Sequence, residues 1–364
     1  MANQIIQGIK AYAKKPVMLF YTGSKAALLF NPEGHKFTKF GTLTVQQVKS
    51  GKMGNYDKTT GFSGASNASV EWIEYPCRFD RYFPIHFDCA EHFASMLEGG
   101  TNPIDAVLAD YYNRELPEEF DSVVFSSWAA EVDPANKTPL VEKPKSYIKL
   151  LNEIRRNIVN SGYAGDVMLF TSATAYSDIE TELASSGLIH NSTLTAIIPA
   201  GKDLGNGKYD DAVEITVDVC KYNNLIIVEV PDSRMFTKYT MLDGKTPGQE
   251  DGGVKPASDA EKIYMIAVPA SNAAFCGFQH ETTQIAIPSG YSYTEKDLRD
   301  MAAWKNGILG NGFYGTIGIN QKANAFDANT RVIYDGQLFA NNKKSVFLFT
   351  APVEGLPEQD DIEG

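Results

Sequence analysis

The sequence predicts an α+β protein with a long extended arm, and three observations lead to this prediction. Residues 70–87 are rich in β-branched and aromatic residues over a length that exceeds an ordinary strand. Apolar residues then recur at helical spacing between residues 104 and 158. Beyond residue 165, short apolar strands are mixed with helices and turns, which is typical of an α+β domain.

The composition fits a folded, acidic chain. The 364 residues are 43% apolar and 21% charged, and 45 Asp and Glu against 33 Lys and Arg give a net charge of −12. This length suits two compact units, or one domain with long excursions. Because binding to phosphates needs clustered cations, the charge argues against a nucleic-acid binder. The four cysteines form no C-x-x-C pair and no apolar run reaches the length of a membrane span, so we expect free thiols, no zinc ribbon and no membrane insertion.

The N-terminal part is expected to be extended. Residues 1–50 contain short apolar runs between Gly and Pro without helical periodicity. Residues 51–68 are rich in Gly, Ser, Thr and Asn, and residues 70–87 form a long strand interrupted near Pro76 and Pro84. Together, residues 51–88 are predicted to form a projecting hairpin with little core of its own.

Three amphipathic helices are predicted to follow. The first has apolar residues at Ile104, Val107, Leu108, Tyr111 and Tyr112. The second begins near Pro117 and carries one apolar stripe, formed by Phe120, Val123, Val124 and Trp128. The third has its apolar face at Tyr147, Leu151, Ile154 and Ile158 and stops at Gly162.

The rest of the chain is predicted to mix strands, one capped helix and loops. Residues 166–171 form a strand, after which Ser172 caps a helix that Gly187 ends. The remaining strands are predicted at residues 213–219, 225–230, 262–268, 283–287, 313–320 and 330–334, with a loop at 241–256 and a helix at 294–304. Residues 345–350 could add an edge strand or a contact to a neighbour, and residues 355–364 are an acidic tail.

No pattern demands catalysis. Gly201, Gly205, Gly207 and Lys208 miss the spacing of a phosphate loop by one residue and predict a surface turn. His86, Asp88 and His92 could be read as a metal set, but they lack the spacing of a metal site and are better explained as structural polar residues. No nucleophile signature is present. We therefore predict no enzyme, no metal and no cofactor.

Several motifs resemble those of tailed-bacteriophage major capsid proteins of the Hong Kong 97 type. They are Tyr56-Asp57, Gly61-Phe62-Ser63-Gly64, Asp80-Arg81-Tyr82-Phe83, His86-Phe87-Asp88 and Leu116-Pro117-Glu118-Glu119-Phe120-Asp121. In that family an extended E-loop leads to the spine helix of a peripheral P-domain, and an axial A-domain follows. The order of the motifs here is similar.

The resemblance implies a division of the chain and a set of contact residues. The implied parts are an N-terminal arm (1–50), an E-loop hairpin (51–90), a P-domain with the spine helix (91–140), an A-domain (141–280), returning P-domain strands (281–328), and an A-domain end strand with an acidic C-terminal extension (329–364). The implied subunit contacts of the E-loop are Tyr56, Gly61, Trp72, Asp80, Arg81 and Asp88. The implied core of the spine helix is Phe120, Val123, Val124 and Trp128.

The function that the resemblance implies is structural: a major capsid protein that self-assembles, as hexamers and pentamers, into an icosahedral shell around the phage genome. The shell would enclose DNA without sequence-specific binding. Implied partners are a separate scaffolding protein and a portal, with room for a decoration protein. The place of action would be the virion capsid, after folding and assembly in the bacterial host cytoplasm.

Two alternatives stay open: an encapsulin-like bacterial compartment shell, and a non-catalytic carbohydrate or surface binding module that uses some of the 18 tyrosines. A hydrolase built on His86 or His92 is the weakest hypothesis.

Overall fold

The computed structural model describes residues 24–29, 42–49, 51–52, 56–59, 61–62, 68–88, 114–188, 190–198, 203–205, 208–209, 213–270, 274–286 and 325–357. The predicted helices around residues 104–112 and 294–304 and the predicted strand at 313–320 lie outside these residues. The account below concerns the described residues.

Three α-helices and eighteen strands are labelled in chain order. The α-helices are α5 (Leu116–Glu131), α6 (Tyr147–Asn160) and α7 (Ala173–Ser185). The 3-10 helices are η1 (Ala26–Leu29), η3 (Pro134–Asn136), η4 (Asp232–Arg234) and η6 (Ala340–Ser345). The strands up to α7 are β1 (Thr42–Lys49), β2 (Tyr56–Asp57), β3 (Gly61–Phe62), β4 (Ser69–Pro76), β5 (Phe79–Asp88), β6 (Lys137–Pro139) and β7 (Val167–Ser172). The later strands are β8 (His190–Ile198), β9 (Asp203–Gly205), β10 (Lys208–Tyr209), β11 (Val213–Tyr222), β12 (Leu225–Val230), β13 (Tyr239–Met241), β14 (Val254–Pro256), β15 (Lys262–Pro269), β16 (Ala274–Ala286), β17 (Ala325–Leu338) and β18 (Phe347–Ala351).

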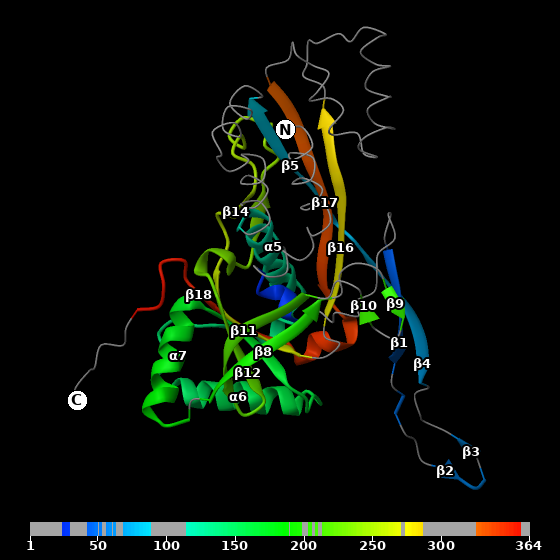
Figure 1. Ribbon diagram of the computed structural model, residues 1–364. Coiled ribbons are helices and arrows are strands. Elements are labelled where there is room, and N and C mark those ends of the chain that lie inside the picture. Colours follow the sequence, from blue (N-terminus) through cyan, green and yellow to red (C-terminus); the bar gives the residue numbers. More distant parts are fainter. Residues whose placement is uncertain are drawn as a thin grey trace.

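The molecule has a compact lobe, a long narrow sheet and a projecting hairpin (Figure 1). The lobe contains a seven-stranded mixed sheet in the order β6-β18-β15-β7-β12-β11-β8. Sheet β16-β17-β5 rises from the lobe beside α5, and strands β1 and β4 project to one side. This arrangement confirms the predicted α+β class.

Helices α6 and α7 cover one face of the lobe sheet, and local sequence signals define both. The apolar face of α6 is the one predicted, and all four of its residues join the core beneath the sheet. Ser146 and Ser172 cap the two helices by accepting hydrogen bonds from backbone N–H groups. Gly162 and Gly187 follow the helices at φ +95° and +65°, a left-handed conformation that glycine adopts without steric cost.

Helix α5 lies between the two large sheets. On one side Phe125 and Trp128 contact Phe170 of β7, with ring centroids 5.2 and 5.8 Å apart. On the other side Phe120 contacts Tyr334 of β17 at 5.5 Å. The predicted stripe of Phe120, Val123, Val124 and Trp128 is buried, but so are Asp121, Ser122 and Phe125 on other sides of the helix. Two covering layers, rather than one, bury most of its circumference.

Asp121 is a buried carboxylate that fastens two other segments to α5. It pairs with Arg234 of η4 at 3.0 Å and accepts hydrogen bonds from Ser24 Oγ (2.5 Å) and from the backbone N–H groups of Lys25 (2.9 Å) and Ala26 (3.0 Å). Burial raises the pKa of the Asp121 carboxyl, and Arg234 and the N-terminal donors oppose the rise. Residues 24–26 are therefore fixed to the central helix.

Several strands differ from their predicted extent. Strand β5 continues through Pro84, which an edge strand tolerates because one side of its backbone needs no ladder partner. The expected short strands at 283–287 and 330–334 are parts of the longer β16 and β17, and β17 spans the domain boundary expected after residue 328. The predicted loop at 241–256 has paired ends, β13 and β14.

Two predictions of strand pairing need correction. The predicted hairpin of β11 and β12 exists, but β11 pairs along nearly all of its length with β8, which the alternation in β11 does not identify. Residues 345–350 were expected to add an edge strand or a contact to a neighbour, whereas β18 lies inside the lobe sheet between β15 and β6. Its apolar residues suit this place, because both faces of the strand are buried.

Replacing the fully buried Val124 with aspartate should destabilise the protein by about 3 kcal/mol or more, since the carboxylate would have no partner between the two layers. Urea unfolding measures the change. Ala130→Asp places the same group on the exposed side of α5 and should cost about 1 kcal/mol or less. Equal unfolding midpoints for the two variants would show that the Val124 side is not a packed interior.

Candidate functional site

The candidate functional site is the projecting β1–β4 hairpin together with its base. The two strands pair antiparallel from Thr42 opposite Pro76 to Lys49 opposite Ser69, and the short strands β2 and β3 pair near the tip. The first limb of the hairpin is thus β1, which lies in the segment expected to be an N-terminal arm. The Gly-rich residues, expected to be this limb, follow β1 toward the tip.

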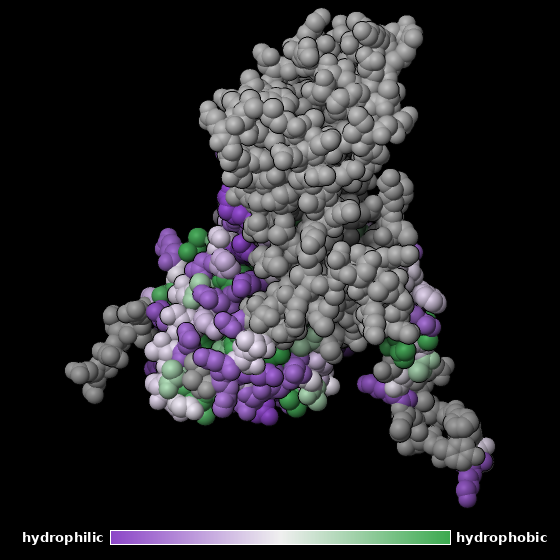
Figure 2. Space-filling view, in the orientation of Figure 1, coloured by the Kyte–Doolittle hydropathy of each residue, from purple (hydrophilic) through white to green (hydrophobic). Residues whose placement is uncertain are grey.

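One face of the hairpin carries three exposed apolar side chains at its outer end. Val48 lies opposite Val70, and Trp72 follows on the same face because side chains alternate along a strand. Their exposed fractions are 63%, 49% and 68%. Figure 2 shows hydrophobic residues on the arm that stands away from the lobe. Adjacent exposed apolar side chains of this size mark a contact surface more often than isolated ones do.

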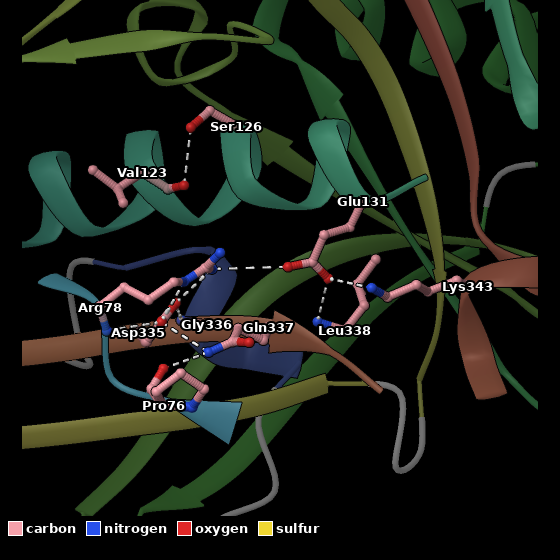
Figure 3. Close-up of polar contacts among 10 residues, drawn as sticks. All are labelled: Pro76, Arg78, Val123, Ser126, Glu131, Asp335, Gly336, Gln337, Leu338 and Lys343. Carbon is pink, nitrogen blue, oxygen red and sulfur yellow. Dashed lines mark hydrogen bonds and ion pairs between the residues drawn. The ribbon is translucent and has the colours of Figure 1, made fainter. Parts of the chain in front are cut away.

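Arg78, directly after the hairpin, binds the buried carboxylate of Asp335 on β17 (Figure 3). Its Nε and one terminal nitrogen donate to the two carboxylate oxygens at 2.7 and 2.9 Å, and its backbone N–H donates at 3.1 Å. The Asp335 side chain has no exposed surface. This bidentate geometry is the strong form of an Arg–carboxylate pair, and it raises the pKa of the Arg78 guanidinium further.

Glu131, the last residue of α5, joins the base to the helix. Its carboxylate accepts a hydrogen bond from the backbone N–H of Leu338 (3.1 Å) and faces Lys343 at 3.5 Å and Arg78 at 3.8 Å. Burial raises the pKa of the Glu131 carboxyl, and the two cations oppose the rise. Two carboxylates and two cations therefore balance at the junction of the hairpin, α5, β17 and η6 (Figure 3).

Uncharged contacts also fasten the hairpin base to the end of β17. The Tyr75 ring meets Phe339 edge to face at 5.4 Å, and the Tyr75 hydroxyl accepts hydrogen bonds from the Ala340 N–H and from Gln47 Nε2. Gln337 Nε2 donates to the carbonyl oxygen of Pro76 at 2.7 Å. The base is thus held by rings, backbone and charges together.

Arg81 was expected to contact a neighbouring subunit, but it has partners within its own chain. It pairs with Glu119 of α5 at 2.7 and 3.1 Å and donates to the carbonyl oxygens of Leu242 and Gly253, each at 2.9 Å. The Tyr334 hydroxyl donates to the same Glu119 carboxylate at 2.9 Å. Arg81 therefore connects β5 and the β13–β14 loop to the central helix.

The other predicted contact residues divide between the hairpin and the body. Tyr56, Gly61 and Trp72 lie on the hairpin strands, whereas Asp80 and Asp88 lie on β5, which pairs with β17. Sequence reasoning missed Asp335 and Glu131 altogether. The signal available was the position of Arg78 and Arg81 within the aromatic segment 70–87, but this signal identifies no partner that is distant in the sequence.

The described residues offer no candidate metal centre: no three His, Cys, Asp or Glu side chains among them could hold an ion together. His86 and Asp88 are placed on β5, and His92 lies outside the described residues. Gly205 pairs with Lys208 in the β9–β10 hairpin, as predicted for a turn. None of the described helices combines the length and apolar character needed to span a membrane.

Replacing Arg78 with alanine should destabilise the protein by about 3–5 kcal/mol, because it leaves the buried Asp335 carboxylate without its cation. Urea unfolding and the melting temperature report the loss. Arg156→Ala is the control, since this arginine of α6 is 70% exposed and its ion pair with Glu153 is long, at 4.0 Å. A loss at Arg78 no larger than that at Arg156 would contradict the assigned role of the pair.

Cys77 should react very slowly with alkylating agents in the native protein. Burial, with the nearby Asp335 charge, raises the pKa of the Cys77 thiol to about 12. Since the thiolate is the reactive form, alkylation at pH 8 should be about a thousandfold slower than for an ordinary cysteine. Mass spectrometry of the labelled peptide measures the rate, and the urea-unfolded chain is the control. Native labelling at the unfolded rate would mean that the hairpin base is open.

Comparisons with known proteins give structural neighbours only. No family model matches the chain, and no curated protein matches it. A structure from Mycobacterium phage Ogopogo has 10% identity and a TM-score of 0.49 over 91% of this chain and 92% of its own. The mature capsid of bacteriophage PhiM1 has 8% identity and a TM-score of 0.47 over 88% and 84%. A virus-like particle from Pyrococcus furiosus has 8% identity and a TM-score of 0.44 over 95% and 99%. The backbone of this protein is thus similar to that of solved phage structures, and a capsid is among them.

Proposed function

We propose that the chain is a structural, non-catalytic subunit that assembles into a closed shell, the major capsid protein of a tailed phage. The observation that carries this proposal is the β1–β4 hairpin, which is firmly anchored at its base and exposes an apolar face at Val48, Val70 and Trp72. The order of extended hairpin, central helix and mixed-sheet lobe supports it, as do the motifs that resemble capsid proteins of the Hong Kong 97 type.

A two-stranded hairpin of this kind needs a partner. Its eight-residue strands reach about 26 Å, yet a two-stranded sheet alone is marginally stable in water. Contact with a neighbouring copy would cover the exposed side chains of Val48, Val70 and Trp72.

Repetition of that contact would build a shell. If each subunit gives its arm to a neighbour and receives another arm, the contact is heterologous, and it closes into a ring when the rotation between neighbours divides a full turn evenly. In this proposal, hexamers and pentamers of the chain form an icosahedral shell in the virion, assembled in the host cytoplasm with a separate scaffolding protein and a portal. The net charge of −12 fits a shell that encloses DNA without binding it tightly.

The double variant Val70→Ser/Trp72→Ser should fold normally but fail to assemble. Both side chains are exposed in the subunit, so their loss should change stability by about 0.5 kcal/mol or less, whereas the intersubunit contact would lose its apolar centre. Negative-stain electron microscopy of the wild-type and variant proteins, each expressed with and without a scaffold, gives the comparison.

Val159→Ser on α6 is the matched control, because Val159 is 51% exposed and belongs to the lobe rather than to the hairpin strands. The wild-type and control proteins should form rings, tubes or closed shells. Variant particles indistinguishable from wild type would contradict the assigned surface, and a wild-type chain that stays monomeric in every condition would contradict the function. Shells that contain a protein cargo and no DNA would indicate a compartment instead.

A further inference from the structure

Helix α5 holds the β5–β17 sheet and the hairpin base at two carboxylates. Arg81 pairs with Glu119, and Arg78 faces Glu131. The two glutamates are about 18 Å apart along the helix. At Glu119 the bonds are short: 2.7 and 3.1 Å to Arg81 and 2.9 Å to the Tyr334 hydroxyl. This end of the sheet is tightly fixed.

The contacts of Glu131 are longer than those of Glu119. Its carboxylate lies 3.1 Å from the Leu338 backbone nitrogen, 3.5 Å from Lys343 and 3.8 Å from Arg78. Arg78 gives its shorter bonds to Asp335, and the terminal nitrogen that lies 3.8 Å from Glu131 also donates to Asp335 at 2.9 Å (Figure 3). The links from Glu131 to the hairpin base are therefore longer than the links within the base.

The hairpin base and the end of β17 form one unit. Tyr75, Pro76 and Arg78 bind residues 335–340 through rings, backbone groups and the ion pair of Arg78 with the buried Asp335 carboxylate. Among the contacts described for the junction, Glu131 is the side chain that joins this unit to the C-terminal end of α5 and, through Lys343, to η6.

We propose that Glu131 is a positioning residue that sets the direction in which the hairpin leaves the body, and with it the curvature of the assembled shell. The second part rests on the proposed function. Two cations and one backbone N–H converge on a single carboxylate at the point where hairpin, helix and η6 meet. Removing its charge should leave both folded parts intact and loosen the angle between them.

Hydrogen exchange of the unassembled full-length chain tests the first part. In Glu131→Gln the amide oxygen can still accept from the Leu338 N–H, but the attraction of Arg78 and Lys343 is lost. Exchange in peptides that cover residues 336–345 and 72–78 should speed up by about tenfold or more. Exchange in the lobe core, residues 225–230, should stay unchanged.

Two further variants control this experiment. Glu71→Gln removes a hairpin carboxylate that pairs only with the exposed Lys49 in the described contacts and should leave exchange at the base unchanged. Lys343→Met removes one cation from Glu131 while the carboxylate stays. Lys343→Met should also speed up exchange at the base, but by less than Glu131→Gln does. Exchange in the double variant Glu131→Gln/Lys343→Met should be only slightly faster than in Glu131→Gln, because both changes break the same ion pair.

Electron microscopy of assembled particles tests the second part. Glu131→Gln should give particles with a broader or shifted distribution of diameters, whereas Glu71→Gln should match wild type. Unchanged exchange at residues 336–345 would overturn the proposal, and so would faster exchange with wild-type diameters. If the wild-type chain forms no particles, the proposed function fails, and the exchange measurement still decides whether Glu131 holds the hairpin.

Discussion

The ion pair between Arg78 and the buried Asp335 is the interaction on which the arrangement of the molecule depends. Asp335 is fully enclosed, and a carboxylate without a partner at such a place would be strongly destabilising. Three donors of Arg78 satisfy it, together with the Gly336 N–H and the Gln337 amide. Because Arg78 directly follows β4 and Asp335 lies on β17, satisfying this charge also fixes where the hairpin begins.

Helix α5 is the second constraint, since it lies between two sheets. Phe120, Phe125 and Trp128 are fully buried, and each contributes about 1.5–3 kcal/mol by removal from water. A helix covered on both sides must also place polar groups in the interior. Asp121 meets that requirement through Arg234 and residues 24–26, so the same helix contacts this segment, the lobe and the long sheet.

These two features divide the hairpin into parts with different physical roles. The base is buried, charge-balanced and tied to three other elements, which gives the arm a defined direction. The outer part has an exposed apolar face and no core of its own among the described residues. Rigidity at the base lowers the entropy lost when the outer part meets a partner, which favours association.

The sequence by itself determined the elements whose signals are local. The apolar spacing of α6, the caps Ser146 and Ser172 and the glycines at 162 and 187 were all readable, because each involves residues within a few positions of one another. The four-residue stripe of α5 was readable for the same reason. The existence of a projecting hairpin and of α+β organisation also followed from these patterns.

Only the tertiary structure decided which strands pair and which charges meet. Alternation in β11 is satisfied equally by β12 or β8, and an apolar segment such as β18 fits an edge or an interior position. Arg78 and Arg81 stand near several acidic residues in the sequence, yet their partners are Asp335, Glu131 and Glu119. The physical reason is that ion pairs and strand ladders depend on distance in space, which packing around α5 sets, whereas helix periods and caps depend on distance along the chain.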